Sequence, residues 1–488
     1  MGCGGVPRLA FVPWKENVFA IATIDDWEPE PGSVVCWHAS PASLTKAGRA
    51  PVSPVPASYQ QAQHLRRYCD HVARGLDMSR LMIFTWDMAG QCDIRAMTYT
   101  INAHLRRHDT YRNWFECTDG ENIVRHTMDN PGDIKVVPVK HGDMTTAELR
   151  EHILAPHPLE WDCWAFGVIQ EADHFVFYAS IAHLCVDPMV LGVLFGEIHM
   201  MYGALVAGAP PLPLPEVGSY DDYCVRQREY TSALTADSPE VREWIEFAEH
   251  NGGSLPRFPL PLGDLSIPTD GELITVTLLD GEQTKRFESA LMDVGARFSG
   301  GVFACAAIAE HELTGAETFY GITPIDTRST PEELTTTGWF TGLLPVTIHT
   351  AATSFSDAAH AAQTSFDSRI QMARVPYDRV VELAPPELGL GRPQPGNLVM
   401  SYLDASIAPL STVANSPLDF RIHHEGRVSH QVSVWVNRLV HETTITVLFP
   451  NNPVARESVD RYVAATKSVY VAVADGKRIG TLHNAARA

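Results

Sequence analysis

The stretch YASIAHLCVDPMV, residues 178–190, joins a run typical of β-strands to a long apolar segment. The β-forming run HFVFYASI, residues 174–181, ends just before a histidine, His183. Asp187 follows and stands directly before a proline, Pro188. Proline fits the first turn of a helix because its missing N–H costs nothing there, and an aspartate before it is a natural N-cap. The stretch therefore predicts a strand, a short connection that holds His183, and a buried helix.

His183 occupies the strand-to-helix connection, where α/β proteins tend to place reacting groups. A neutral imidazole accepts a proton near pH 7 because its ordinary pKa is about 6.5. A hydroxyl that attacks a thioester needs such a base, and Asp187 would then stabilise the loop that aims the ring. The HxxxD pattern is short and common, however, so spacing alone favours a histidine bonded to backbone and an aspartate that only caps a helix.

The composition is that of a folded, acidic protein with a sizeable core. Hydrophobic residues make up 45% of the 488 residues and charged residues 19%, which does not resemble a disordered chain. The net charge of −21 argues against general nucleic-acid binding, which depends on cationic surface. Nine cysteines without a CxxC pair indicate reduced thiols. We expect a cytoplasmic protein, with a peripheral position at the inner face of the membrane left open.

No stretch of the sequence has the pattern of a transmembrane helix. The most apolar region, residues 175–207, contains His183, Asp187, Glu197 and His199. These ionisable residues make the region a poor membrane span. It is instead typical of a buried strand followed by a buried helix.

Helical and strand patterns alternate along the whole chain, which indicates an α/β fold. Residues 58–75 have the spacing of a helix, and residues 80–88 have the composition of a strand. The segment GALVAGAPPLPLPEVG, residues 203–218, is rich in proline and glycine and is the best candidate linker. We therefore predict two mixed α/β lobes, an N-terminal lobe over 1–205 that holds the HxxxD motif and a C-terminal lobe over 206–488.

Around His183 the sequence resembles the condensation-domain superfamily, which includes chloramphenicol acetyltransferase, non-ribosomal peptide condensation domains and plant BAHD enzymes. The usual motif of the superfamily is HHxxxDG, and here Ala182 and Pro188 replace its first His and its Gly. Other segments resemble the superfamily in the same order: NAHLRRHDTYR (102–112), GITPIDTRSTPEELTTTGWFTGLLPV (321–346) and VPYDRVVEL (375–383). The resemblance implies two chloramphenicol-acetyltransferase-like lobes with the active site in a tunnel between them.

Within that superfamily the chain is similar to the mycobacterial polyketide-associated acyltransferases that acylate trehalose. The similar segments include SYQQAQHLRRYC (58–69), FYASIAHLCVDPM (177–189) and VMSYLDASIAPLSTVANS (399–416). The resemblance implies transfer of a long-chain fatty acyl group from acyl-CoA to a hydroxyl of trehalose or trehalose 2-sulfate, in sulfolipid or polyacyltrehalose biosynthesis. Acyl-CoA would be a substrate, and no cofactor is implied. A polyketide synthase and membrane-transport machinery are further candidate partners.

The resemblance also implies roles for three residues. His183 would be the catalytic base that deprotonates the acceptor hydroxyl. Arg328, in the segment DTRST, corresponds to the arginine that pairs with the motif aspartate in relatives. A buried aspartate at a strand–helix junction needs such a partner, so Asp187 and Arg328 are expected to support the site structurally. No cofactor-binding residue is assigned, and no metal-ligand cluster stands out in the sequence.

Local groups of cationic and imidazole side chains admit two interpretations. Most arginine runs are solvated helix faces, but the alternative is contact with CoA phosphates or a sugar sulfate. The arginines in question are Arg66, Arg67, Arg106, Arg107 and Arg112. The histidines expected at the surface of a hairpin are His423, His424 and His430.

Two other functions remain open on the sequence. A condensation-type acyltransferase would take its acyl group from a carrier protein instead of CoA. A non-catalytic binding homologue is suggested by the missing first His and Gly of the motif, although the retained His183, Asp187 and Arg328 argue against it. Sulfated and unsulfated trehalose are not distinguished.

Overall fold

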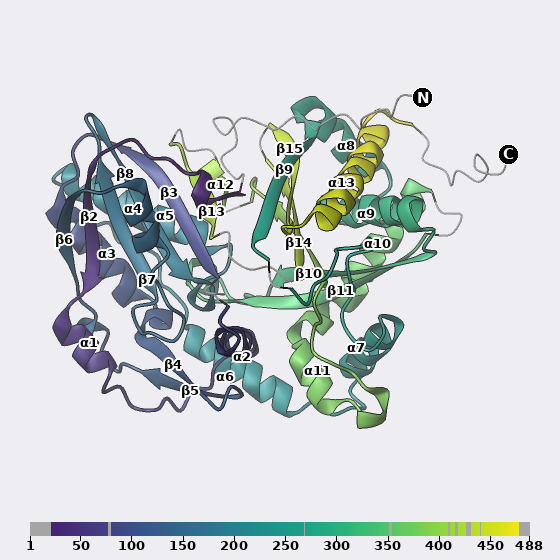
Figure 1. Cartoon of the computed structure of the whole chain (residues 1–488), viewed down its shortest axis with the longest axis horizontal. Helices are drawn as coiled ribbons and strands as arrows, with labels where there is room; N and C mark the ends of the chain where they lie inside the picture. Colours follow the sequence, from purple (N-terminus) through teal and green to yellow (C-terminus); the bar gives the residue numbers. More distant parts are fainter. Residues whose placement is uncertain are drawn as a thin grey trace.

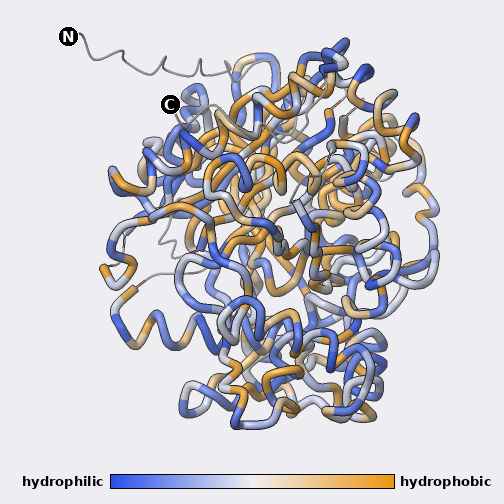
Figure 2. The backbone as a smooth tube through the Cα atoms, turned by 90° about the vertical axis from the view of Figure 1, so that its right-hand side faces the viewer, coloured by the Kyte–Doolittle hydropathy of each residue, from blue (hydrophilic) through white to orange (hydrophobic). Residues whose placement is uncertain are grey.

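Two mixed α/β lobes lie side by side in the computed structural model (Figure 1), which confirms the predicted fold class. Each lobe has its own apolar core. Apolar segments lie mostly in the interior and polar segments mostly toward the outside (Figure 2). The structure describes residues 21–76, 80–267, 269–350, 354–407, 410–414, 418–425, 431–439 and 441–477.

The first lobe is built on a seven-stranded sheet. In spatial order its strands are β1 (Ile21–Thr23), β13 (Arg421–His424), β3 (Leu81–Ala89), β8 (His174–Ala182), β7 (Trp164–Gln170), β2 (Ser33–Ala39) and β6 (Val136–Asp143). The helices of this half are α1 (Pro41–Ala47), α2 (Tyr59–Ala73), α3 (Ile94–Arg107), α4 (Thr146–Ile153) and α5 (Val190–Val206). A separate hairpin consists of β4 (Asn113–Thr118) and β5 (Asn122–Thr127).

The second lobe contains a four-stranded sheet and a long two-stranded ribbon. The sheet has the order β12 (Leu398–Asp404), β14 (Val432–Arg438), β15 (Glu442–Pro450) and β9 (Gly271–Asp280), and the ribbon pairs β10 (Thr318–Asp326) with β11 (Thr341–His349). The helices of this half are α6 (Tyr220–Ser232), α7 (Pro239–His250), α8 (Gly281–Asp293), α9 (Phe298–Thr314), α10 (Phe355–Arg369), α11 (Tyr377–Leu383) and α13 (Pro453–Ala474). The short helix α12 (Leu410–Ala414) lies between them in sequence but packs against α5 of the first lobe.

Short 3-10 turns connect several of these elements. They are η2 (Ile24–Asp26), η3 (Asp109–Arg112), η4 (Pro131–Asp133), η5 (His183–Cys185), η6 (Glu333–Thr335), η7 (Ile370–Arg374) and η8 (Pro386–Leu388). Between α5 and α6, residues 209–219 form neither helix nor strand, where the proline-rich linker is predicted. The exact boundary between the lobes stays a prediction.

Strand β8 places the HxxxD segment at the end of the first sheet. It lies between β3 and β7 and pairs antiparallel with both. Every residue of β8 after His174 is buried. A strand covered on both faces is a continuous apolar run rather than an alternating one, which is why the sequence predicted it clearly. Leu81 pairs with Ala182 at its end, so His183 leaves the sheet opposite Arg80.

A crossover from the second half completes the first sheet. β13 pairs antiparallel with β3 and parallel with β1, and Ala405, Leu410, Val413 and Phe420 belong to the first apolar core. The prediction of surface histidines on a hairpin is therefore wrong for His423, which is buried in β13, and His424 is partly buried. His423 is buried because β13 lies between β1 and β3 in the first sheet. His430 lies outside the described residues.

Among the described residues, no single helix is both long and apolar enough to cross a membrane. Helices α8 and α9 meet the same test only when taken together, and the pair is bent by 97°.

Candidate active site

His183 stands where side chains from both halves of the chain meet. Its backbone N–H donates to the Arg80 carbonyl at 3.0 Å, which continues the pairing of β3 with β8. Gln61 of α2 donates from Nε2 to the Leu184 carbonyl at 2.9 Å and holds the following turn. The imidazole lies against the indole of Trp339, from the second half, with 4.3 Å between ring centroids.

The surroundings of His183 keep its imidazole neutral. Burial and the positive charge of Arg80 lower the pKa of His183 to about 3. Nδ1 is buried and makes no hydrogen bond of ordinary geometry to the described part of the chain. The side chain as a whole retains some contact with solvent. A neutral ring is the form that a general base requires.

Asp187 and Arg328 form a buried bidentate ion pair between the two halves. The distances are 2.8 Å from Arg328 Nη1 to Asp187 Oδ2 and 3.1 Å from Nη2 to Oδ1. The Phe340 N–H donates to Oδ2 at 2.9 Å and the Met189 N–H to Oδ1 at 3.1 Å. These four donors occupy both carboxylate oxygens. No hydrogen bond joins the Asp187 carboxylate to His183 within the described residues, so this geometry favours a structural role over a catalytic one.

The donors around Asp187 also change how the next helix starts. The sequence predicts Pro188 as the first helical residue, but α5 begins at Val190, so that prediction is wrong by two residues. The carboxylate still accepts the Met189 N–H, although its main contacts are with Arg328 and Phe340. Because those partners fix the orientation of the carboxylate, the first turn adjusts to it.

Further hydrogen bonds fix the Arg328 side chain. Its Nε donates to the Glu333 carbonyl at 2.8 Å, and its Nη2 donates to the Thr336 carbonyl at 3.0 Å. Burial alone would lower the pKa of Arg328, but Asp187 and Asp326 more than offset burial and raise it. Arg328 therefore keeps its positive charge in a fixed orientation, and the carboxylate of Asp187 balances that charge, as a structural ion pair requires.

Residues 327–340, between β10 and β11, carry both Arg328 and Trp339 to the first half. The shape of this segment depends on Gly338, where an added Cβ would clash with the ring of Tyr220. The Tyr220 hydroxyl donates to the Trp339 carbonyl at 3.2 Å. Close packing against α6 thus sets the position of the indole beside His183.

Sequence reasoning missed a buried polar network behind the site. Glu197 of α5 accepts from His104 Nδ1 at 2.8 Å and from Arg107 Nε at 2.8 Å, and it lies 3.1 Å from His108 Nε2. His108 Nδ1 in turn accepts the Thr337 N–H at 3.3 Å. An acidic residue inside the most apolar segment was a usable signal, because a buried carboxylate needs partners. The network ties α3 and α5 to the segment 327–340.

Two groups of side chains gather potential metal ligands, although the sequence predicted no metal site. Within each group the ligand atoms lie within 4.8 Å of one another; the groups are Cys36 with His38 and His141, and His104 with His108 and Glu197. In the second group Arg107 already pairs with Glu197, so a further cation would meet a positive charge. The absence of a metal stays a prediction.

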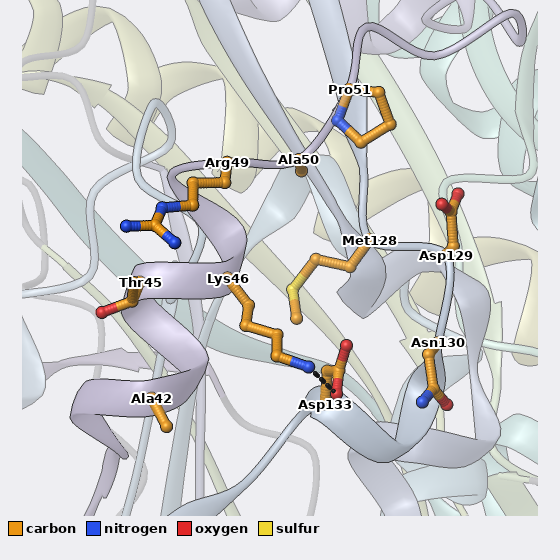
Figure 3. A pocket seen from close by; sticks show the side chains of 10 residues that line it. All are labelled: Ala42, Thr45, Lys46, Arg49, Ala50, Pro51, Met128, Asp129, Asn130 and Asp133. Carbon is orange, nitrogen blue, oxygen red and sulfur yellow. Dashed lines mark hydrogen bonds and ion pairs between the residues drawn. The ribbon is translucent and has the colours of Figure 1, made fainter.

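A surface pocket beside α1 is separate from these residues (Figure 3). Lys46 and Asp133 form an ion pair of 2.7 Å there. None of the residues predicted for the site lines this pocket. Asp133 already neutralises Lys46, and the pocket offers no histidine to act as a base. The tunnel predicted between the lobes stays a prediction.

Comparison with known proteins assigns this fold and motif to a class. The condensation-domain family matches residues 71–389, which is well over half of the chain. The chain belongs to the condensation-domain family, and the predicted resemblance is confirmed.

Relatives of known name narrow that class. Trehalose-2-sulfate acyltransferase PapA2 of Mycobacterium tuberculosis is 67% identical over 459 residues, which cover 94% of this chain and 98% of PapA2. The 2'-acyl-2-O-sulfo-trehalose (hydroxy)phthioceranyltransferase PapA1 of the same organism is 54% identical over 468 residues, or 95% of this chain and 91% of PapA1. At such identity the chain is an acyltransferase, which confirms the predicted enzyme class and argues against a non-catalytic homologue.

Solved structures agree with this assignment. A structure of PapA2 acyl transferase superimposes with a TM-score of 0.92 at 66% identity and covers 94% of this chain and 100% of that one. The condensation domain of the Monacolin K polyketide synthase MokA gives a TM-score of 0.65 at 16% identity, with 87% and 97% covered. The second likeness shows the fold alone.

Proposed function

We propose that this chain transfers a long-chain fatty acyl group from acyl-CoA to a hydroxyl of trehalose or trehalose 2-sulfate. The observation that supports it most is the neutral His183 imidazole at the junction of the two halves. It occurs in a chain 67% identical to a trehalose-2-sulfate acyltransferase. A polyketide synthase, membrane-transport machinery and a cytoplasmic location at the membrane face stay predictions.

In this proposal His183 is the general base of a direct transfer. Its Nε2 takes the proton of the acceptor hydroxyl as the oxygen attacks the thioester carbonyl carbon. A C–O bond forms, and the tetrahedral intermediate then collapses with cleavage of the C–S bond. The proton passes from Nε2 to the departing CoA thiolate. Backbone N–H groups near the motif would stabilise the oxyanion.

Asp187 and Arg328 hold the His183 turn in position but do not exchange protons with substrate. The carboxylate already has four donors, and none of them is the imidazole. Arg328 belongs to the second half, so the pair also fixes how the two halves meet at His183. This arrangement differs from a Ser-His-Asp triad, in which the carboxylate orients the imidazole directly.

Product formation from defined substrates tests the proposal. Purified protein is incubated with palmitoyl-CoA and either trehalose or trehalose 2-sulfate, and the products are analysed by mass spectrometry. We expect a palmitoylated sugar with release of CoA, and no product with a folded His183→Ala variant. If the acyl group were transferred only from an acylated carrier protein, the chain would be a condensation-type acyltransferase and acyl-CoA would not be its donor.

The length of the donor chain provides a second test. Each buried CH₂ contributes about 0.8 kcal/mol, so a site built for long chains favours them strongly. We expect palmitoyl-CoA to exceed acetyl-CoA in kcat/KM by several orders of magnitude. Equal use of the two donors would remove the long-chain assignment.

A further inference from the structure

Arg80 stands beside His183 in an unusual backbone conformation. Leu81 pairs with Ala182, so Arg80 and His183 are the next opposed positions past the end of the two strands. The φ of Arg80 is 50°, in the left-handed region that side-chain-bearing residues rarely adopt. Such conformations concentrate at functional sites. The Arg80 guanidinium lies 5.9 Å from the centroid of the Trp339 ring, the same indole that contacts His183.

The Arg80 guanidinium has no acceptor among the residues that the structure describes. It forms no hydrogen bond or ion pair with any residue that the structure describes, although it is largely enclosed by protein. Burial lowers the pKa of Arg80, and among the described carboxylates Glu425 opposes this effect without forming an ion pair. An enclosed guanidinium without a partner is costly, so its retention beside the base points to an anionic ligand.

The structure also separates the arginines that the sequence grouped together. Four of the five have acceptors: Arg66 pairs with Glu121, Arg106 donates to the Ile134 carbonyl, Arg107 pairs with Glu197, and Arg112 donates to the Asp129 carbonyl. Arg67 has no hydrogen bond or ion pair from its side chain to the described residues. Asp378, the carboxylate whose charge acts to raise the pKa of Arg67, accepts from Gln63 at 2.8 Å.

Arg67 and Arg80 belong to one electrostatic environment. Burial and the positive charge of Arg80 both act to lower the pKa of Arg67. Arg67 lies on α2, whose Gln61 holds the turn after His183. In a chain of net charge −21, two guanidiniums that act on each other electrostatically and form no ion pair with the described residues mark a local positive field that would attract an anion to the base.

We propose that Arg80, assisted by Arg67, forms a subsite for the sulfate group of a sulfated sugar acceptor, beside the His183 base. This inference rests on the proposed function and specifies its acceptor as trehalose 2-sulfate. Arginine suits the task because its planar fork binds the oxygens of a tetrahedral anion with charge-assisted hydrogen bonds. The bound sulfate also offsets the Arg80 charge, one of the causes that lower the pKa of His183.

The position of Arg80 favours a sugar sulfate over a CoA phosphate. Carbon 2 of each glucose unit in trehalose adjoins the glycosidic bond, so a sulfate at one unit lies close to hydroxyls of the other. When an acceptor hydroxyl contacts His183, the sulfate therefore lies near Arg80, the residue opposite His183 past the ends of the two strands. In acyl-CoA the long pantetheine arm separates the thioester from every phosphate, so those phosphates lie far from the imidazole.

Acceptor discrimination in matched variants tests the subsite. With palmitoyl-CoA as donor, kcat/KM is measured for trehalose 2-sulfate and for trehalose in wild type, Arg80→Gln, Arg80→Lys, Arg67→Gln and Arg66→Gln. We expect wild type to prefer the sulfated sugar. Arg80→Gln should lower that preference roughly 10- to 100-fold, as loss of charge-assisted hydrogen bonds implies, and Arg67→Gln should lower it less. Arg80→Lys should retain part of it, and Arg66→Gln, which removes a paired charge, should keep it.

The ratio of the two acceptors isolates the sulfate, because any effect of an arginine variant on folding or on the acyl donor is common to both sugars. An equal loss with both sugars, or a wild type without preference, overturns the subsite while leaving the transferase intact. Transfer to neither sugar by wild type overturns the proposed function itself.

Two further arms complete the test. Palmitoyl-CoA is compared with palmitoyl N-acetylcysteamine thioester, which lacks phosphates. If Arg80→Gln raises KM for the CoA donor alone, the anion is a CoA phosphate and the sulfate assignment falls.

Wild-type protein is also melted with trehalose 2-sulfate or trehalose at equal concentration. We expect a larger rise in melting temperature with the sulfated sugar, and equal rises would contradict the subsite even if a variant failed to fold.

Discussion

Arg328 and Arg80 both lie next to the HxxxD segment, yet their surroundings are opposite. Arg328 has a bidentate carboxylate partner and two carbonyl acceptors, and its side chain is 1% exposed. Arg80 has no hydrogen bond or ion pair to the described residues, and neither has the buried Nδ1 of its neighbour His183. A fully satisfied group holds structure, whereas an unsatisfied group at the edge of solvent is available to a substrate. The comparison divides the residues at and around the motif into a structural part, Asp187 with Arg328, and a reacting part, His183 with Arg80.

Removing the reacting part should affect catalysis most. Replacement of His183 by Ala removes general-base catalysis, which is worth about 10²–10⁴-fold in rate. The melting temperature should change little, because no hydrogen bond of ordinary geometry joins the buried Nδ1 to the described residues. Steady-state transfer assays and thermal melts of the same preparation check both. A folded variant with full activity would eliminate His183 as the base.

Breaking the structural part should reverse that pattern. Asp187→Ala or Arg328→Ala leaves one buried charge without its partner, which typically costs about 3–5 kcal/mol of folding free energy. Both variants should melt at lower temperature and lose activity, and the double variant should lose less than the sum because the pair is removed together. Urea unfolding of the four proteins measures this cycle. An Asp187→Ala protein of full stability without activity would instead give Asp187 a direct catalytic role.

This division explains what the sequence could and could not predict. Strand β8 was predictable because burial on both faces makes it uniformly apolar. The pairing of Asp187 with Arg328 came from the family resemblance, since residues 141 positions apart leave no local pattern. The start of α5 was predicted incorrectly because local capping rules do not contain the tertiary partners of Asp187. His183 was found from its place at the end of the strand.

Features that depend on neighbours distant in the sequence escaped prediction. Glu197 lies in α5, His104 lies in α3 and His108 directly follows α3, and no periodicity in the sequence reveals that the two helices are in contact. Arg80 resembles any basic residue before a strand, and its importance appears only when β3 is paired with β8. The place of β13 in the first sheet was not predicted for the same reason, because its partner β3 is distant in the sequence. Local pattern therefore predicts elements well, and long-range partners poorly.

A smaller effect is expected at the packing contact that places Trp339. A side chain at Gly338 would overlap the Tyr220 ring, and such overpacking typically costs about 1–3 kcal/mol. Gly338→Ala should therefore lower the melting temperature and shift the indole beside His183. Gly203→Ala in α5 is a matched control, because an added Cβ there meets nothing within 4 Å and should be neutral or slightly stabilising. Equal melting temperatures for the two variants would show that the 327–340 segment adapts freely.

The smallest effect expected is the pH dependence that the reacting part gives to stability. The folded-state pKa of His183, lowered by burial and Arg80 to about 3, lies below its unfolded value of about 6.5. The unfolded chain therefore takes up a proton first as the pH falls, so this contribution is complete above pH 6.5 and declines from there toward pH 3. Between pH 7 and pH 5 wild type should lose about 1–2 kcal/mol more unfolding free energy than His183→Ala, measured by urea unfolding. Arg80→Gln should reduce this difference because it removes the second cause of the lowered pKa. Arg328→Lys, which retains the charge of the structural pair, should leave it unchanged. Identical pH slopes in wild type and His183→Ala would mean that the imidazole is not held neutral, and the division between the two arginines would then lose its electrostatic basis.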